Sequence, residues 1–375
     1  MKIEERGLVY DATRQLPAAR VASFTGLLVT KAGTAFCSFQ CGSKKHALDS
    51  TVRIFRSTDH GRTWSDTGSR FETSFQGVAG SLSSGEMEEV SPGRLMVITT
   101  WFDRSEPARP IFDPVTEGIL RTKQLVAFSE DEGKSWTPWR EIPIAGLKGC
   151  ASTGPLLRWT DSTIAYPFES YKEYDDPQPG RHGAWFIATK DGGRTFGAPV
   201  LVAQDPQGDV YYWDQRMSVG KTPGEYISLF WTHDLRQKKD LAVHVKHHRP
   251  GVAGGDVPRT TGLPGQISAP LLLDDGRLLA GVIAREKPGT VTLCQSDDDG
   301  KTWPHRLVIY THDEKALLTQ GAENIDFVQY WEDMGKWSFG HPAIRLVGKN
   351  KLLIVHYAGV PNCLSVHWIR VDLTR

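Results

Sequence analysis

The sequence predicts an all-β protein, a six-bladed β-propeller with four antiparallel strands in each blade. Two internal repeats indicate this fold class: a short Asp/Gly motif and a recurring apolar hairpin. A motif that recurs at intervals of tens of residues marks one supersecondary unit per copy, and such units assemble into solenoids or propellers. We predict that residues 1–375 form one such domain, since all-β folds of this length are often single units.

The short motif has the pattern S/T-x-D-x-G-x-S/T-W/F. Its copies span residues 57–64, 129–136, 189–196 and 296–303. The Asp side chain can accept hydrogen bonds from backbone N–H groups two residues on, Gly supplies a positive φ, and the terminal aromatic ring is a large apolar anchor. Alternating apolar residues lead into the copies, as at Val52 and Ile54, so each copy is predicted to be a tight hairpin between two strands.

A second repeat predicts the number of blades. Short apolar runs flank a turn residue at six places, namely Gly33, Gly93, Asp161, Gly224, Gly276 and Asn350. Each run predicts an inner strand, a turn and a second strand, with the short motif joining strands three and four. The fourth and sixth blades lack a clear motif, and a degenerate copy is expected near residues 245–251. Residues 7–10 are expected to complete the last blade and so hide the sheet edges.

The composition argues against two classes of binding partner. Lys plus Arg and Asp plus Glu each number 44, so the formal net charge is zero, which argues against nucleic acid or an anionic membrane as a partner. Residues 1–6 lack the apolar core of a signal peptide, so a cytoplasmic location is expected. The five cysteines have no zinc-ligand spacing and are expected to be mostly buried free thiols. No metal or cofactor is predicted, and a homo-oligomer is compatible with the sequence.

The motif copies and hairpins resemble the Asp boxes, or BNR repeats, of the sialidase superfamily, over nearly the whole chain. The resemblance implies that the motif aspartates are structural and lie on the face away from the active site. It also implies a site with three arginines, a tyrosine nucleophile paired with a glutamate, and an acid/base aspartate. Most of that set is unmatched: residues 23–28 lack the first arginine, and residues 339–342 lack the tyrosine.

Four residues are candidates for catalysis under this resemblance. Asp49 lies in the loop before the strand that carries the first motif, where the family has its acid/base aspartate, and His46 in the same loop is an alternative. Asp214 lies near the start of the fourth inner strand, where the family has its glutamate. Tyr357 lies on the strand beside the position expected for the tyrosine.

Strand ends on the predicted central face supply the binding candidates. Several second strands end in aromatic and ionisable residues, which suit stacking on sugar rings and acid/base chemistry. Arginines hold acidic groups by charge-assisted hydrogen bonds, and Asp214 and Arg216 are two residues apart, on one strand face. The predicted substrate-binding residues are Arg20, Trp101, Asp103, Arg104, Glu169, Tyr171, Arg216, His233, Gln266, Arg285 and His341. The proline-rich insertion at residues 105–121 is typical of a lid or a subunit contact.

The sequence therefore predicts a sialidase-like glycoside hydrolase that is exo-acting on a terminal, acidic sugar, with carbohydrate as its partner. Two alternatives stay open. One is a non-catalytic, glycan-binding propeller. The other is a lyase that acts on a uronic acid with a Tyr or His base.

Overall fold

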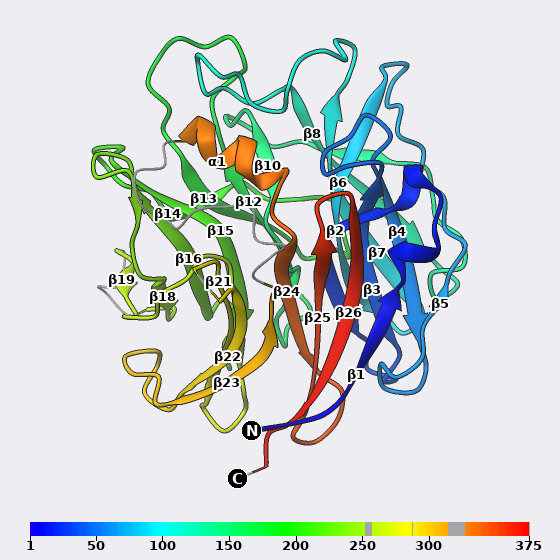
Figure 1. The fold of residues 1–375 in the computed structure, drawn as a ribbon, viewed down its shortest axis with the longest axis vertical. Helices are drawn as coiled ribbons and strands as arrows, with labels where there is room; N and C mark the ends of the chain where they lie inside the picture. Colours follow the sequence, from blue (N-terminus) through cyan, green and yellow to red (C-terminus); the bar gives the residue numbers. More distant parts are fainter. Residues whose placement is uncertain (252–256, 287, 314–326, 375) are drawn as a thin grey trace.

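The computed structural model describes residues 1–251, 257–286, 288–313 and 327–374. The described residues are built almost entirely from β-strands, in five hydrogen-bonded sheets (Figure 1). Two short 3₁₀-helices, Ala12–Arg14 and Pro17–Ala19, follow the first strand. The α-helix α1 (Phe327–Met334) lies at the end of the molecule away from the two chain termini (Figure 1).

Four of the sheets contain four or five strands each. The first contains β6 (Gly80–Ser91), β7 (Arg94–Asp103), β8 (Thr122–Ser129) and β9 (Arg140–Ile142). The second contains β10 (Cys150–Ser152), β11 (Leu157–Arg158), β12 (Ile164–Ser170), β13 (Gly183–Thr189) and β14 (Val200–Ala203). The third contains β15 (Val210–Val219), β16 (Tyr226–Asp234), β17 (Lys239–Asp240), β18 (His244–His248) and β19 (Arg259–Thr260). The fourth contains β20 (Ser268–Leu272), β21 (Leu278–Ala284), β22 (Thr290–Ser296) and β23 (His305–Thr311).

The fifth sheet has eight strands and joins the two ends of the chain. One antiparallel group contains β24 (Phe339–Leu346), β25 (Lys351–Val360), β26 (Cys363–Asp372) and β1 (Lys2–Tyr10). The other contains β2 (Val21–Val29), β3 (Ala35–Gly42), β4 (Thr51–Ser57) and β5 (Ser65–Asp66). A single parallel bridge, Val21 to Leu364, connects the groups. The N-terminal strand thus runs beside the C-terminal one, and both termini lie together in Figure 1.

The six predicted apolar hairpins are confirmed. They are the pairs β2–β3, β6–β7, β11–β12, β15–β16, β20–β21 and β24–β25, and all six are antiparallel. In the third of them the inner strand is split, since β10 and β11 both pair with β12. The turns use the predicted residues: Gly33 and Asn350, for example, adopt φ of 85° and 56°.

The four motif copies form one kind of turn. Each joins the third and fourth strands of a unit, as β8 to β9. In that copy the Asp131 carboxylate accepts hydrogen bonds from the backbone N–H groups of Lys134 and Ser135, and the Gly133 N–H donates to the Ser129 hydroxyl. Hydrogen bonds from the hydroxyl and N–H of Ser135 lower the pKa of Asp131. These carboxylates therefore serve the turn.

The degenerate copy predicted near residues 245–251 falls at the end of β18, and the residues that follow it, 252–256, lie outside the described part of the chain. The cysteine prediction is confirmed. Cys37, Cys41, Cys150 and Cys294 are buried free thiols, and Cys363 is a partly buried one. None of the described helices is long and apolar enough to cross a membrane.

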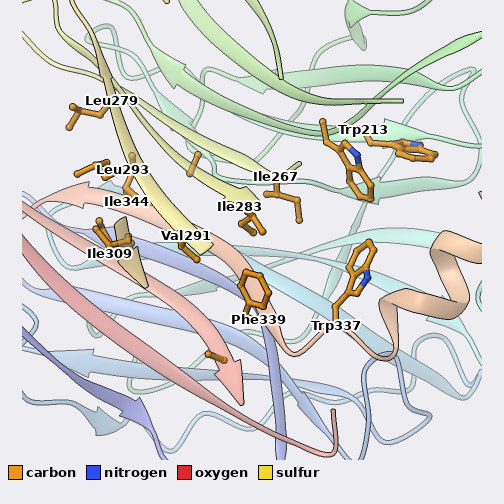
Figure 2. Close-up of a cluster of buried hydrophobic side chains, with 14 of the residues drawn as sticks. Trp213, Ile267, Leu279, Ile283, Val291, Leu293, Ile309, Trp337, Phe339 and Ile344 are labelled. Carbon is orange, nitrogen blue, oxygen red and sulfur yellow. The ribbon is translucent and has the colours of Figure 1, made fainter. Parts of the chain in front are cut away.

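Apolar side chains pack between neighbouring sheets. The cluster in Figure 2 joins β21 to β24 through Leu279, Ile283 and Ile344, all at most 1% exposed. Trp213 and Trp337 lie at one end of it, beside α1 (Figure 2). Fully burying each aliphatic side chain contributes about 1.5–3 kcal/mol, so packing between the sheets is a main source of stability. At the end near α1, this core meets the cavity described next.

Candidate functional site

A cavity opens where the first strands of four units are interrupted by bulges. The pairing register shifts at four equivalent places, between Ser23 and Gly26, Leu82 and Gly85, Trp213 and Arg216, and Gly340 and Ala343. Phe24, Asp214 and His341 lie inside these shifts and adopt φ of 54°, 48° and 56°, which is uncommon for residues with a side chain. A bulge redirects a side chain out of the strand alternation. All three residues line the same cavity.

The cavity has an aromatic wall, a polar set and a roof. The aromatic wall consists of Phe24, Phe102, Trp213 and Trp231. The polar set consists of His46, Ser83, Ser84, Ser152, Thr153, Glu169, Tyr171, Asp214 and His341. The roof comes from the 105–121 insertion and from α1, and consists of Ile111, Phe112, Ile119, Tyr330, Trp331 and Met334. Phe112 and Trp331 stack with ring centroids 3.7 Å apart, which joins the two roof segments.

Glu169 is the buried carboxyl group of the cavity. It lies at the end of β12 and is 3% exposed. The Tyr171 hydroxyl donates to its Oε2 at 2.5 Å, and the Gln215 backbone N–H donates to its Oε1 at 3.2 Å. Burial and the negative charge of Asp214 raise the pKa of Glu169 to about 8. Glu169 is therefore protonated at neutral pH and can act as a proton donor.

Asp214 is the second carboxyl group of the cavity and forms an ion pair with Arg216. Arg216 donates from Nη2 to Asp214 Oδ1 at 3.0 Å, so this guanidinium contacts a carboxylate of the protein itself. The same Nη2 atom hydrogen-bonds with His341 Nε2, and His341 Nδ1 lies 3.2 Å from the Thr25 carbonyl oxygen. Burial and the Arg216 charge lower the pKa of His341, so this imidazole is neutral. The chain of contacts connects β15, β24 and β2 around the cavity.

His46 lies on the wall between two aromatic rings. Its ring centroid is 4.8 Å from that of Phe24 and 6.0 Å from that of Phe102. Burial, with the positive charges of Arg104 and Lys45, lowers the pKa of His46 to about 3. A histidine that is neutral throughout the physiological range does not donate protons as a general acid. Its place at the cavity suits hydrogen bonding to a ligand instead of the predicted acid/base role.

Several other predicted site residues do not line this cavity. The Asp49 side chain is exposed and accepts from the backbone N–H and hydroxyl of Ser43, because it closes its own loop. Arg20 donates to the carbonyl oxygen of Gln15. Asp103 caps the loop that follows β7. Trp101 is 1% exposed and donates to a backbone carbonyl, since it packs in the core instead of offering a ring face to a ligand.

Five further predicted residues form a layer behind the wall. Arg285 donates to Gln266 Oε1 at 2.8 Å and to the Phe339 carbonyl oxygen, while its guanidinium lies 4.1 Å from the Trp337 ring centroid. Tyr357 is buried, and its hydroxyl accepts from Lys45. The other two act on wall residues: Arg104 donates to the His46 carbonyl oxygen, and the ring of His233 stacks on Trp213. These residues position the wall but are not part of it.

Conversely, several cavity residues were missed by the sequence analysis. Trp213 and Trp231 face each other across β15 and β16, and each lies within two residues of a predicted site residue, which was a usable signal. Ser83 and Ser84 reach the cavity only because β6 is bulged there. The residues of α1 had no signal in the strand pattern. Among the described residues, no group of three or more His, Cys, Asp or Glu side chains is arranged to hold a metal ion.

Comparison with solved structures identifies the fold, whereas comparison with protein families and curated proteins finds no match. No protein-family model matches the sequence, and no curated protein matches it. A Dyadobacter fermentans protein of unknown function has a similar structure, with a TM-score of 0.72 and 18% identity over 100% of this chain and 99% of that one. The Hadza microbial sialidase Hz136 has a TM-score of 0.69 and 14% identity, covering 99% of this chain and 69% of that one.

A Penicillium chrysogenum alpha-L-arabinanase solved with arabinobiose is also similar. Its TM-score is 0.63 and its identity 12%, covering 100% of this chain and 99% of that one. Identities this low show a shared fold, and a shared fold does not by itself give a function. The chain therefore has the sialidase-like fold, in agreement with the resemblance seen in its repeats.

Proposed function

We propose that this protein is a glycoside hydrolase that removes a terminal sugar from a glycan. The observation that supports this is that Glu169 and Asp214 line the same cavity. Burial and the charge of Asp214 raise the pKa of Glu169 to about 8, and Asp214 forms an ion pair with Arg216. Two carboxyl groups in unlike environments supply the acid and the base or nucleophile of glycoside hydrolysis.

In the proposed reaction, Glu169 gives its proton to the glycosidic oxygen as the bond from that oxygen to the anomeric carbon breaks. Asp214 either attacks the anomeric carbon or takes a proton from the attacking water, and the separation of the two carboxyl groups in the bound enzyme decides which. Water supplies the new hydroxyl group in both cases. Tyr171 and the Gln215 N–H hold the Glu169 carboxyl in place. The rings of Trp213 and Trp231 supply apolar surface for the sugar.

The charge of the sugar follows from what the arginines contact. The predicted acidic sugar depended on free guanidinium groups, but Arg216 is bound to Asp214 and Arg285 to Gln266 and the Phe339 carbonyl. An acidic group would have to replace these contacts and approach the Asp214 carboxylate. The arrangement thus favours a terminal sugar without a carboxylate.

We also infer that the strands count as six blades in one domain of residues 1–375. The eight-stranded sheet divides naturally at its single parallel bridge, and each half then has four antiparallel strands like the other sheets. Pairing of β1 with β26 leaves the N-terminal strand as the outer strand of the last blade. Closure of this kind protects strand edges from pairing with other chains.

The test is a panel of nitrophenyl glycosides that includes neutral pentosides and hexosides and a sialoside. We expect release from at least one neutral glycoside and none from the sialoside. Release only from the sialoside would restore the acidic-sugar hypothesis. No release from any glycoside, together with binding on a glycan array, would favour the non-catalytic alternative. Appearance of an unsaturated uronate from a uronic-acid polymer would favour the lyase.

A further inference from the structure

A groove runs beside the cavity, between the 43–49 loop, the 107–114 part of the insertion and the C-terminal end of α1. We propose that this groove binds the sugar unit on the leaving side of the scissile bond, so that the substrate is an oligosaccharide instead of the glycoside of a small alcohol. This inference rests on the proposed hydrolase function, which places the terminal sugar in the cavity.

The groove and the cavity are continuous. His46, Phe112, Trp331 and Met334 each line both spaces. The stacked pair Phe112 and Trp331 therefore forms the partition, with one side toward the carboxyl groups and the other toward the groove. A glycan whose terminal ring lies beside Asp214 meets the groove at the edge of this aromatic pair.

The groove walls are tied together by buried polar contacts. Lys45 is 7% exposed and reaches from the 43–49 loop to the end of α1, where its Nζ donates to the carbonyl oxygens of Met334 and Trp337 at 3.0 and 2.5 Å. The same Nζ donates to the Tyr357 hydroxyl at 3.0 Å. On the other side of the loop, Arg104 donates to the His46 carbonyl oxygen at 2.9 Å. A site whose walls are held by their own hydrogen bonds loses little conformational entropy on binding.

The groove surface suits a sugar ring. Leu48 is 48% exposed at its edge, and Pro107 and Pro110 are exposed on the opposite wall. Together with Trp331, these side chains offer apolar surface for the C–H face of a ring. The exposed side chains of Lys44 and Asp49 stand among them as partners for hydroxyl groups. Pockets for polar organic ligands combine apolar surface with a few polar groups in this way.

The experiment compares two substrates with the same terminal sugar, a glycosyl fluoride and a disaccharide. The leaving group of the glycosyl fluoride is too small to occupy the groove, whereas the second sugar of the disaccharide fills it. Leu48→Trp narrows the groove without touching the cavity, and Leu16→Trp, at a site 78% exposed and outside the groove, is the matched control. We expect Leu48→Trp to lower kcat/KM for the disaccharide about tenfold, the loss of about 1.4 kcal/mol of binding, and to leave the fluoride unchanged. Equal effects on both substrates, or none on either, would overturn the inference.

A binding measurement separates this inference from the hydrolase proposal. Calorimetry with Asp214→Asn, with and without Leu48→Trp, compares the disaccharide with its terminal monosaccharide. Weaker binding of the disaccharide alone in the double variant supports the groove site, even if the wild-type protein hydrolyses neither substrate. Equal affinities for the two sugars in Asp214→Asn would show that the groove binds nothing.

Discussion

Arg216 and Asp214 lie two residues apart on β15, and Nη2 of the first donates to Oδ1 of the second at 3.0 Å across a β-bulge. In a regular strand, residues two apart point to the same face and are neighbours only along the strand. Here the bulge gives Asp214 a φ of 48°, and its carboxylate reaches the cavity while the guanidinium stays buried behind it. The pair thus orients the carboxylate and stabilises its charge.

Glu169→Gln should remove the proton donor and keep the shape of the side chain. We expect kcat on a glycoside with a poor leaving group to fall by about 10²–10⁴-fold, the usual contribution of general acid catalysis. A glycosyl fluoride needs less protonation and should lose much less. Steady-state kinetics on both substrates measure this. A similar loss on the two would show that Glu169 is not the acid.

The raised pKa of Glu169 predicts the alkaline limb of the activity profile. The acid must be protonated, so kcat/KM should fall as the pH rises through about 8. Tyr171→Phe removes the hydrogen bond that favours the ionised form of Glu169 and should move this limb upward. A pH profile of each variant measures the shift. If the alkaline limb does not move in Tyr171→Phe, it reports the titration of a group other than Glu169.

The same group should make stability depend on pH. Glu169 keeps its proton in the folded state up to about pH 8, while in the unfolded chain it loses its proton near the ordinary value of 4.5. The folded state therefore binds more protons between these values, and stability falls as the pH rises, by at most about 1.4 kcal/mol per pH unit. Urea unfolding from pH 5 to pH 8 should show a smaller decline for Glu169→Gln than for the wild type.

Arg216→Lys should destabilise the protein, because a lysine cannot contact Asp214 and His341 with the same geometry. Arg216 is 2% exposed, and leaving buried polar partners unsatisfied costs about 1–3 kcal/mol. Arg14→Lys is the control, since Arg14 pairs with Asp11 in an exposed ion pair and should change stability by less than about 0.5 kcal/mol. Equal urea midpoints for the two variants would contradict a structural role for the buried pair.

Gly193→Ala tests the packing of the motif turn. Gly193 has a φ of 86°, and an added Cβ would lie 2.8 Å from Met96 Sδ and 2.9 Å from the Phe128 ring. Gly68→Ala is the matched control, because Gly68 has a φ of 78° but no atom within 4 Å of the added Cβ. Both variants bear the cost of positive φ, about 1–2 kcal/mol. Only Gly193→Ala should lose a further 1–3 kcal/mol or so through overpacking, and thermal unfolding gives the difference.

The repeated turns and hairpins were predictable because their causes are local. The carboxylate of Asp131 accepts from the N–H groups three and four residues on, in place of the predicted two, and Gly133 has a positive φ. Neither needs a distant partner, so a turn at residues 129–136 was predictable. The apolar runs are equally local, since alternation marks a half-buried strand wherever it occurs.

Which residues line the cavity depends on the folded arrangement of the strands. Strand alternation does not show where a strand bulges, and the bulges place Phe24 and His341 on the cavity wall. Spacing along the chain does not show which aromatic ring is needed by the core, so Trp101 is buried while Trp231 lines the cavity. The repeating strands and turns were predictable from the sequence, because their energies come from neighbours in the chain. The raised pKa of Glu169 could not be predicted from the sequence. Burial and the charge of Asp214 affect this carboxyl group only once β12 and β15 have come together.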